Sequence, residues 1–294
     1  GDTFGAMSVG YVPEFFRKFK KQLFSTIQFP VPNEYRLPKG FTLSDYQNHC
    51  LEKIEKRFSK NNDIAAFIME SGAQMAGGVI IYPKDFQKKI RELCKKYDIL
   101  FVLDEIATGF GRLGSMVQYQ DQKSIPDIVA YGKMLTGGYL TMAATLANKK
   151  IYDSFSGEFN DWKHLFHGHT YTGNPIAAAV ANENLQMYKK YNLIKQVQKT
   201  SKIFEKYSQE ILDIDIVGDV RHKGMLMGIE LVSNKKKKTP IRTKKSINKV
   251  FFEEGKKQGI YLRTLGNIVM LVPPLSIQQN ELELLLKKTI KTIQ

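Results

Sequence analysis

The sequence predicts an α/β protein: a large domain on a mostly parallel β-sheet with helices on both faces, followed by a smaller C-terminal α+β domain. The chain has 294 residues, near the upper limit of about 250–300 residues for one hydrophobic core. From residue 64 onward, short apolar runs alternate with amphipathic segments, which is typical of a parallel sheet with crossover helices. Strand-like runs then cluster near the end, so we divide the chain into residues 1–210 and 211–294.

The elements of the large domain follow one another at short intervals. Apolar runs of strand length occupy residues 64–69, 98–103, 127–131 and 140–147. The run Asp98–Leu103 is almost wholly apolar, which predicts a strand buried on both faces. Between the first two runs, residues 85–97 repeat apolar side chains at helical spacing.

Residues 174–211 predict two helices. Asn174 can cap a helix and Pro175 fits its first turn, and no breaker follows through Tyr191. We expect a second helix over Ile194–Ile211. The C-terminal domain is predicted to contain strands at 215–221, 225–232, 260–263 and 268–272 and helices at 245–258 and 277–290.

Composition excludes several classes of protein. A chain that is 43% hydrophobic and 25% charged is neither disordered nor fibrous. Two cysteines, Cys50 and Cys94, exclude a disulfide scaffold and suggest a reducing, cytoplasmic location. The least polar stretch, Ile64–Tyr82, contains Glu70 and three glycines, so we expect no membrane span.

The net charge of +15 raises the question of nucleic acid. The basic residues are 36 Lys and only 8 Arg, whereas base and phosphate readers favour the planar fork of Arg. The one dense run, Lys235–Lys238, has no interleaved aromatic residues. We therefore interpret it as a solvated loop and expect no nucleic-acid partner.

Two residues at predicted strand ends suggest a specific chemistry. Asp104, with Glu105 beside it, ends the run 98–103, and Lys133 follows the run 127–131 among glycines and apolar residues. Ligands bind at the carboxyl ends of strands in open α/β sheets. We expect the lysine to be partly desolvated there, which frees its amine as a nucleophile. Lysine as a Schiff-base partner and aspartate paired to a pyridinium nitrogen suit pyridoxal 5'-phosphate.

Two other motifs are weaker. Residues 109–114 match G-x-G-x-x-G, but five residues separate them from the strand and no long helix follows, so we exclude a dinucleotide site. His164, His167 and His169 lack the spacing and partner ligands of a metal site, so we predict no metal. The loop 168–175 precedes a helix, and its backbone N–H groups and the Thr170 hydroxyl could hold a phosphate.

Arg263 ends a short strand-like run. An arginine near a strand end can bind a carboxylate through two parallel hydrogen bonds. A structural ion pair is an equal alternative for this residue.

Taken together, these motifs resemble the class III (ω-amino acid) aminotransferases, which have PLP fold type I with a mixed, mostly parallel sheet. The resemblance rests on residues 1–9 (GDTFGAMSV), 104–112 (DEIATGFGR), Gly132-Lys133, and 167–175 (HGHTYTGNP), and it runs to the end of the chain. It is greatest to the biotin-pathway branch, which aminates 7-keto-8-aminopelargonate to 7,8-diaminononanoate with S-adenosylmethionine or lysine as donor. Ornithine- and aminobutyrate-type members are the alternative.

The resemblance implies a role for each matching residue. Lys133 would be the Schiff-base lysine and would also contact substrate, and Asp104 would pair with the cofactor's ring nitrogen. The remaining assignments are Glu70, His169 and Thr170 to the cofactor, and Gly168, Arg263, Asp2 and Arg112 to the substrate. The phosphate ligands His169 and Thr170 would come from the neighbouring subunit of a homodimer.

The resemblance also implies that the chain corresponds to the C-terminal portion of a family member. The preceding stretch of the family carries a phosphate-binding loop, a tyrosine stacked on the cofactor and much of the small domain. Within the loop, His169, Tyr171 and Thr172 differ from members that use S-adenosylmethionine and are closer to those that use lysine. The amino donor stays open.

Overall fold

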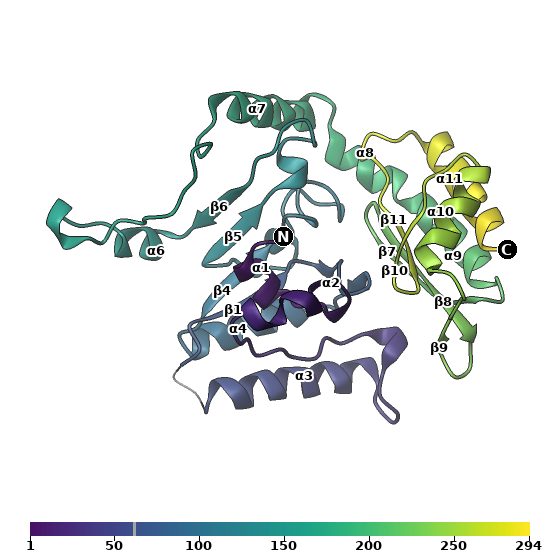
Figure 1. Cartoon of the computed structure of the whole chain (residues 1–294), viewed down its shortest axis with the longest axis horizontal. Helices are drawn as coiled ribbons and strands as arrows, with labels where there is room; N and C mark the ends of the chain where they lie inside the picture. The colour runs from purple at the N-terminus through teal and green to yellow at the C-terminus, as the bar shows by residue number, and fades with distance from the viewer. Residues whose placement is uncertain (61–62) are drawn as a thin grey trace. The chain divides into compact units, whose positions relative to one another are not determined.

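The computed structural model describes residues 1–60 and 63–294 (Figure 1). Residues 1–68 with 82–101 form one compact unit, and residues 69–81 with 102–294 form a second. The predicted boundary between residues 210 and 211 stays a prediction, although the first strand of the C-terminal sheet begins soon after it, at Val217.

The first unit is mainly helical. Its elements are α1 (Phe4–Val9), α2 (Pro13–Phe16), the 3-10 turns η1 (Arg17–Gln22) and η2 (Glu34–Arg36), α3 (Leu43–Phe58) and α4 (Phe86–Lys96). A capping box between Thr42 and Asp45 begins α3. The predicted helix over residues 85–97 is confirmed as α4, with Ile90 and Cys94 fully buried.

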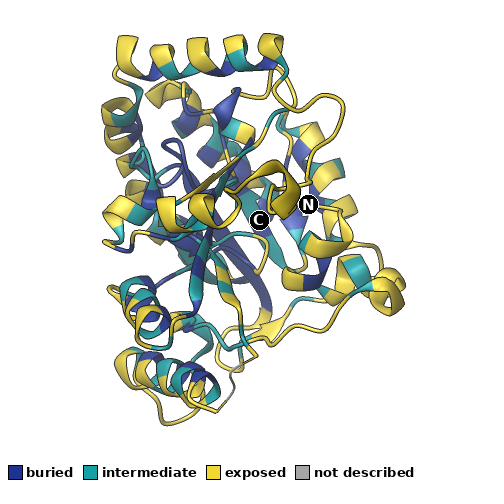
Figure 2. Ribbon diagram, turned by 90° about the vertical axis from the view of Figure 1, so that its left-hand side faces the viewer, coloured by how far each residue is buried: buried dark blue, intermediate teal, exposed yellow. Residues whose placement is uncertain are grey.

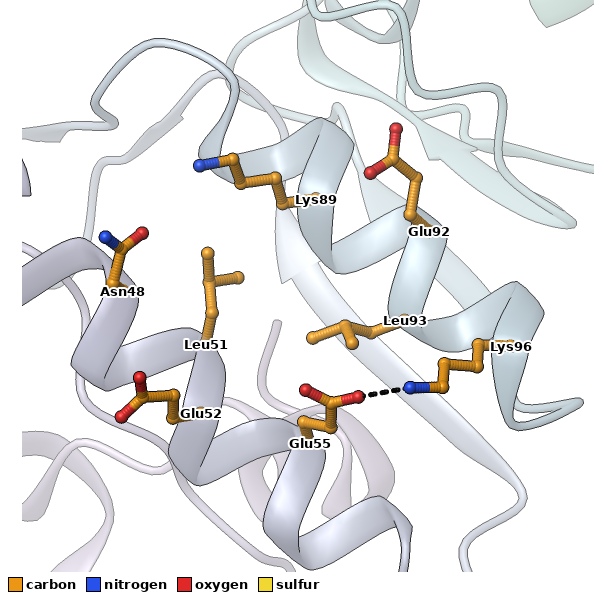
Figure 3. A pocket seen from close by; sticks show the side chains of 8 residues that line it. All are labelled: Asn48, Leu51, Glu52, Glu55, Lys89, Glu92, Leu93 and Lys96. Carbon is orange, nitrogen blue, oxygen red and sulfur yellow. Dashed lines mark hydrogen bonds and ion pairs between the residues drawn. The ribbon is translucent and has the colours of Figure 1, made fainter.

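A groove of about 400 Å³ lies between α3 and α4 (Figure 3). Leu51 and Leu93 line it together with charged side chains, and Lys96 Nζ lies 2.6 Å from Glu55 Oε1. None of the predicted site residues lines this groove. An exposed ion pair of this kind adds little stability.

The main sheet has the strand order β1-β4-β5-β6, from β1 (Ala66–Glu70), β4 (Leu100–Asp104), β5 (Ile128–Tyr131) and β6 (Ala144–Ala147). The boundary between the two units passes through β1 and β4. Strands β4 and β5 are parallel, whereas β6 runs antiparallel to β5. The four predicted strands are therefore confirmed, in a mixed sheet.

One strand differs from its prediction. Along β4, Phe101 and Leu103 are buried while Leu100, Val102 and Asp104 are partly exposed. Successive side chains of a strand point to opposite faces, and one face of β4 is not fully covered in this chain. The expectation of a strand buried on both faces is wrong here.

The rest of the second unit begins with short elements. These are β2 (Ala73–Gln74), β3 (Ile80–Ile81), α5 (Gln118–Asp121), η3 (Lys133–Leu135), α6 (Lys149–Ser154) and η4 (Phe159–Asp161). Helix α7 (Pro175–Lys190) begins as predicted, because Asn174 Oδ1 accepts hydrogen bonds from the N–H groups of Ile176 and Ala177. The predicted helix over residues 194–211 is two helices, α8 (Leu193–Thr200) and α9 (Lys202–Leu212), separated at Ser201.

The C-terminal sheet has the order β10-β11-β8-β7, with the short β9 (Thr239–Pro240) beside β8. Its strands are β7 (Val217–Lys223), β8 (Leu226–Asn234), β10 (Arg263–Leu265) and β11 (Ile268–Leu271). Helices α9, α10 (Ile247–Lys257) and α11 (Gln279–Ile293) pack on it as one layer (Figure 1). Strand β8 is buried along most of its length, whereas β7 is mostly half-buried. In Figure 2 the helices of the molecule show exposed residues on their outer faces. The strand predicted at 260–263 begins instead at Arg263, because the chain pairs only from the hairpin Arg263↔Met270 onward.

The loop between β2 and β3 packs closely against β8. Val79 is fully buried with a left-handed φ of 55°, which is rare for a β-branched residue. A Cβ atom added at Gly228 would lie 2.8 Å from Val79 Cβ. Arg221 Nε donates to the Val79 carbonyl at 2.7 Å, and its Nη1 lies 2.9 Å from Glu230 Oε2. The absence of a side chain at Gly228 therefore makes room for Val79 and its strained loop.

None of the helices in residues 1–60 and 63–294 is long and apolar enough to cross a membrane.

The Gly228→Ala variant is expected to lose about 1–3 kcal/mol of unfolding free energy, because the added methyl overpacks against Val79. The measurement is the midpoint of urea unfolding. Gly5→Ala is the control, since a Cβ there meets no atom within 4 Å and alanine favours the helix. Equal midpoints for the two variants would contradict the close packing at Gly228.

Candidate functional site

Asp104 and Lys133 lie at the same edge of the main sheet. Asp104 is the last residue of β4, and Lys133 follows β5 after Gly132. The two strands are parallel, with Asp104 opposite Ala130, and Glu105 N–H donates to the Ala130 carbonyl at 2.9 Å. Because carboxyl ends of parallel strands share an edge, the structure brings a carboxylate and a primary amine to it.

Glu70, the last residue of β1, joins this edge. The N–H of the next residue, Ser71, donates to the Asp104 carbonyl at 3.0 Å. Glu70 Oε2 accepts a hydrogen bond from Met75 N–H at 3.0 Å. Burial, with a smaller contribution from the charge of Asp104, raises the pKa of Glu70 to about 7, and the Met75 N–H and Lys133 oppose the rise. Two carboxyl groups and an amine therefore interact at three strand ends.

The Asp104 side chain is held by its own loop. Its Oδ1 accepts a hydrogen bond from Ile106 N–H at 2.8 Å. This bond fixes the orientation of the carboxylate at the strand end, where it is partly buried.

Lys133 departs from one expectation. Its side chain is exposed, in contrast to the partly desolvated lysine that the flanking sequence suggested. The reason is that the following Gly137, Gly138 and Tyr139 are themselves exposed and do not cover it. Its backbone has a left-handed φ of 42°, an uncommon conformation for a residue with a side chain.

Glu105, the residue after Asp104, points away from the edge and binds the backbone of a nearby helix. It is fully buried and accepts hydrogen bonds from Gln118 N–H at 2.9 Å and Tyr119 N–H at 2.6 Å. Burial raises its pKa, and these two N–H groups and the Ser71 hydroxyl oppose the rise. Glu105 thus satisfies the backbone at the start of α5 and Asp104 alone of the two reaches the edge.

Arg112 is buried beneath the C-terminal part of the chain. Its Nη1 donates to the carbonyls of Met225 at 2.9 Å and Pro273 at 2.7 Å. Burial lowers its pKa to about 10. Its Nη2 lies 4.0 Å from Met134 Sδ, next to Lys133. The carbonyls occupy one end of the guanidinium, and a contact with substrate stays a prediction.

Gly168, His169 and Thr170 lie on an arm. Figure 1 shows the chain between β6 and α7 leaving the sheet as an extended segment that carries α6. All three residues are exposed. His169 N–H donates to Thr172 Oγ1 at 3.0 Å, and Tyr171 N–H donates to His169 Nδ1 at 3.1 Å. The arm therefore has local order, and its predicted phosphate-binding role stays a prediction.

Two further predicted substrate residues, Arg263 and Asp2, are both exposed. Arg263 is exposed at the start of β10, an outer strand of the C-terminal sheet. Asp2 is exposed and precedes Thr3, the N-cap of α1, in the other compact unit.

The histidines on the arm form no metal centre with neighbouring ligands. Within the described ranges, no three His, Cys, Asp or Glu side chains are grouped so that they could hold a metal ion. His164 instead contacts the ring of Phe166, with centroids 4.1 Å apart.

Sequence reasoning did not single out Asn184. Its Nδ2 donates to the carbonyls of Met134 at 2.7 Å and Leu135 at 3.1 Å, in the turn that begins with Lys133. The available signal was a polar side chain on the same helical face as the apolar Ala177, Ala181 and Tyr188.

Comparison with known proteins matches residues 1–293 to the family model "Aminotransferase class-III". The adenosylmethionine-8-amino-7-oxononanoate aminotransferase of Geobacter sulfurreducens is 38% identical over 298 residues, covering 100% of this chain and 66% of that protein. The Staphylococcus aureus enzyme of the same name is 40% identical, covering 98% of this chain and 63% of its own length.

The crystal structure of the Methanocaldococcus jannaschii enzyme of that name superposes with a TM-score of 0.88 at 38% identity, covering 100% of this chain and 65% of the other. The chain spans just under two thirds of the length of the curated relatives it matches. The predicted α/β fold class, PLP fold type I, is confirmed by this likeness. With the family model matching nearly every residue and the lysine and aspartate at adjoining strand ends, this chain belongs to the class III aminotransferases.

Proposed function

We propose that this chain carries the lysine-bearing part of a pyridoxal phosphate-dependent aminotransferase of biotin biosynthesis. The reaction is transfer of an amino group to 7-keto-8-aminopelargonate (8-amino-7-oxononanoate), giving 7,8-diaminononanoate. The observation that carries the proposal is the pairing of β4 with β5, which brings Asp104 and Lys133 to one edge. The relatives' names support the substrate and support S-adenosylmethionine as donor, with lysine as the alternative from the loop residues Tyr171 and Thr172.

The residues at the edge fit pyridoxal phosphate. The cofactor needs a primary amine to hold its carbonyl carbon and an anion beside its ring nitrogen. Lys133 offers the amine on an exposed side chain, and Asp104 offers a carboxylate. When bound, the cofactor supplies an electron sink and carries the amino group between the two substrates.

Each residue has a role that follows from its chemistry. Asp104 would keep a proton on the ring nitrogen, because a nearby anion favours the charged form. The Lys133 amine would move a proton to and from the substrate's reacting carbon. Arg263 would bind the substrate carboxylate, and Asp2, Arg112 and Gly168 would complete the substrate pocket.

Glu70 would act in its protonated, neutral form, as a hydrogen-bond donor. A carboxyl group with a pKa of about 7 is largely neutral below neutral pH and can then donate a hydrogen bond. Beside Asp104, a neutral Glu70 leaves one negative charge rather than two at the cofactor's ring. We propose that Glu70 orients the cofactor in this form.

A homodimer would complete the site. The arm between β6 and α7 exposes aromatic side chains, including Phe159, Trp162 and Phe166 at 78%, 68% and 69% exposure. Trp162 and Phe166 stack with ring centroids 6.0 Å apart. Contiguous exposed apolar groups of this kind mark interaction surfaces. A second copy seated on the arm would receive His169 and Thr170 as ligands for the cofactor phosphate.

Two further parts of the proposal rest on the sequence pattern. We propose that residues 211–294 form the small domain of the enzyme, starting with β7. We also propose a cytoplasmic location, which is supported by two cysteines that are buried and form no disulfide, as is usual in a reducing compartment.

Mixing the chain with pyridoxal phosphate and reducing with borohydride is expected to give one modified peptide, at Lys133. In Lys133→Ala that adduct and its visible absorbance band should be lost, because no other amine follows β5 at this edge in the described residues. Mass spectrometry of the digest is the measurement. Lys195→Ala, on the exposed surface of α8, is the control and should be labelled like wild type. Adducts scattered over surface lysines in wild type would contradict the proposal.

The Glu70→Gln variant is expected to change the pH dependence of stability. The pKa of Glu70 is raised from 4.5 to about 7, so the folded chain keeps a proton that the unfolded chain loses. Wild-type stability should therefore fall relative to the variant as pH rises from 4.5 to 7, by about 3 kcal/mol. Urea unfolding at several pH values measures this. Glu183→Gln, at an exposed site on α7, should run parallel to wild type, and a parallel Glu70→Gln curve would refute the assignment.

Raising the protein concentration is expected to change the emission wavelength of Trp162, the one tryptophan in the sequence. Burial of its ring in a dimer should shift the emission to the blue as concentration rises, while sedimentation shows twice the monomer mass. The Phe166→Asp variant should remain monomeric as concentration rises, and its Trp162 emission should stay at the longer wavelength of a solvent-exposed indole. Ile125→Asp, exposed elsewhere at 71%, is the control. A wild-type chain that stays monomeric at all concentrations would contradict the proposed interface.

A further inference from the structure

The turn that presents Lys133 has a backbone that needs support. Gly132 is extended, with φ at −169°, and Lys133 follows in the left-handed region at 42°. A residue with a Cβ atom adopts that region only at some cost, so the surrounding structure has to hold it there. The conformation decides where the amine points, because the side chain leaves the backbone at this residue.

Two kinds of bond hold the turn. Locally, Leu135 N–H donates to the Gly132 carbonyl at 2.9 Å, and Thr136 Oγ1 donates to the Leu140 carbonyl at 2.6 Å. The tertiary support comes from Asn184 of α7, whose Nδ2 donates to the carbonyls of Met134 and Leu135. One side-chain amide therefore uses both of its donors on the two residues that directly follow Lys133.

Helix α7 is well placed to carry this amide. Ala177, Ala181, Asn184 and Tyr188 follow one another at helical spacing on one face, and the other three are buried. Tyr188 Oη donates to the Phe110 carbonyl at 2.8 Å and anchors the helix one turn beyond Asn184. A polar side chain in the middle of such a face is costly unless its hydrogen bonds are made.

We propose that Asn184 is a positioning residue for Lys133. By holding the carbonyls of Met134 and Leu135 it keeps Lys133 in the left-handed conformation and its amine at the Asp104 edge. The inference deepens the proposed function and rests on Lys133 being the cofactor lysine. It assigns to α7 a part in the site that is separate from the loop preceding the helix.

Three variants separate the amide donor from the shape of the side chain. Asn184→Ala removes both bonds. Asn184→Asp keeps the size but replaces the donor with an acceptor that faces two carbonyls. Asn184→Gln keeps the donor on a longer stem. Asn182→Ala is the matched control, because it is exposed on the same helix and makes the same change in helix propensity.

The first readout needs no cofactor. Competitive acetylation, followed by mass spectrometry over a range of pH, gives the reactivity of Lys133 relative to the exposed Lys195 on α8. The second readout is the fraction of Lys133 that borohydride fixes to pyridoxal phosphate at a set concentration. Both are measured below the thermal midpoint of each variant, so that a folded chain is compared with a folded chain.

Asn184→Ala and Asn184→Asp are expected to change the acetylation rate of Lys133 relative to that of Lys195 and to weaken capture of the cofactor by about tenfold, the effect of losing two hydrogen bonds. Asn182→Ala should match wild type, and Asn184→Gln should recover part of the capture. If Asn184→Ala does not fold, the Asp and Gln variants decide by the same comparison.

The possible failures are distinguishable. Wild-type levels of acetylation and capture in Asn184→Asp would overturn the positioning role and leave the proposed function intact. Absence of capture at Lys133 in wild type would overturn the proposed function. In that case a changed acetylation rate of Lys133 relative to Lys195 in the Asn184 variants, but not in Asn182→Ala, would still support the positioning role. An unchanged relative rate would overturn it.

Discussion

The parallel pairing of β4 with β5 is the constraint on which the rest of the site depends. Its register sets Asp104 opposite Ala130 and carries on to the bond from Glu105 N–H to the Ala130 carbonyl. Successive side chains of a strand alternate between faces, so a slip of one residue would exchange Asp104 and Glu105. The register thus decides which of two adjacent carboxylates lies at the edge that carries Lys133 and which is buried against the backbone of Gln118 and Tyr119.

The edge is held by residues distant in sequence. Ser71 N–H fixes the end of β1 to Asp104, and Asn184 holds the turn after Lys133. Arg112 ties the loop after Asp104 to the carbonyls of Met225 and Pro273. Each bond gives a backbone carbonyl a protein donor, which is a usual way in which the segments around a site acquire one conformation.

Lys133 and the arm between β6 and α7 share one property, which is that both are open to solvent in this chain. A lysine at a strand end, a histidine–threonine loop and a row of aromatic rings all remain open to solvent in this chain. The proposed dimer would cover the aromatic rings and bring His169 and Thr170 to a partner's edge. The same contact would then lower solvent access where the proposed chemistry requires a defined environment.

Local patterns in the sequence determined most of the elements and the chemistry of the edge. The apolar runs predicted β1, β4, β5 and β6, and the Asn174–Pro175 pair predicted the start of α7. Asp104 and Lys133 were identified from strand ends, from the glycine-rich segment around Lys133 and from the family resemblance. These features depend on neighbours along the chain, because capping, periodicity and strand termination are local. Only the tertiary structure decided the antiparallel direction of β6, the break at Ser201, the buried position of Arg112 and the contact of Asn184 with the Lys133 turn. Each of these features depends on contacts between residues far apart in the sequence or on the space available in the packed fold. Local sequence patterns predict neither the contacts nor the space.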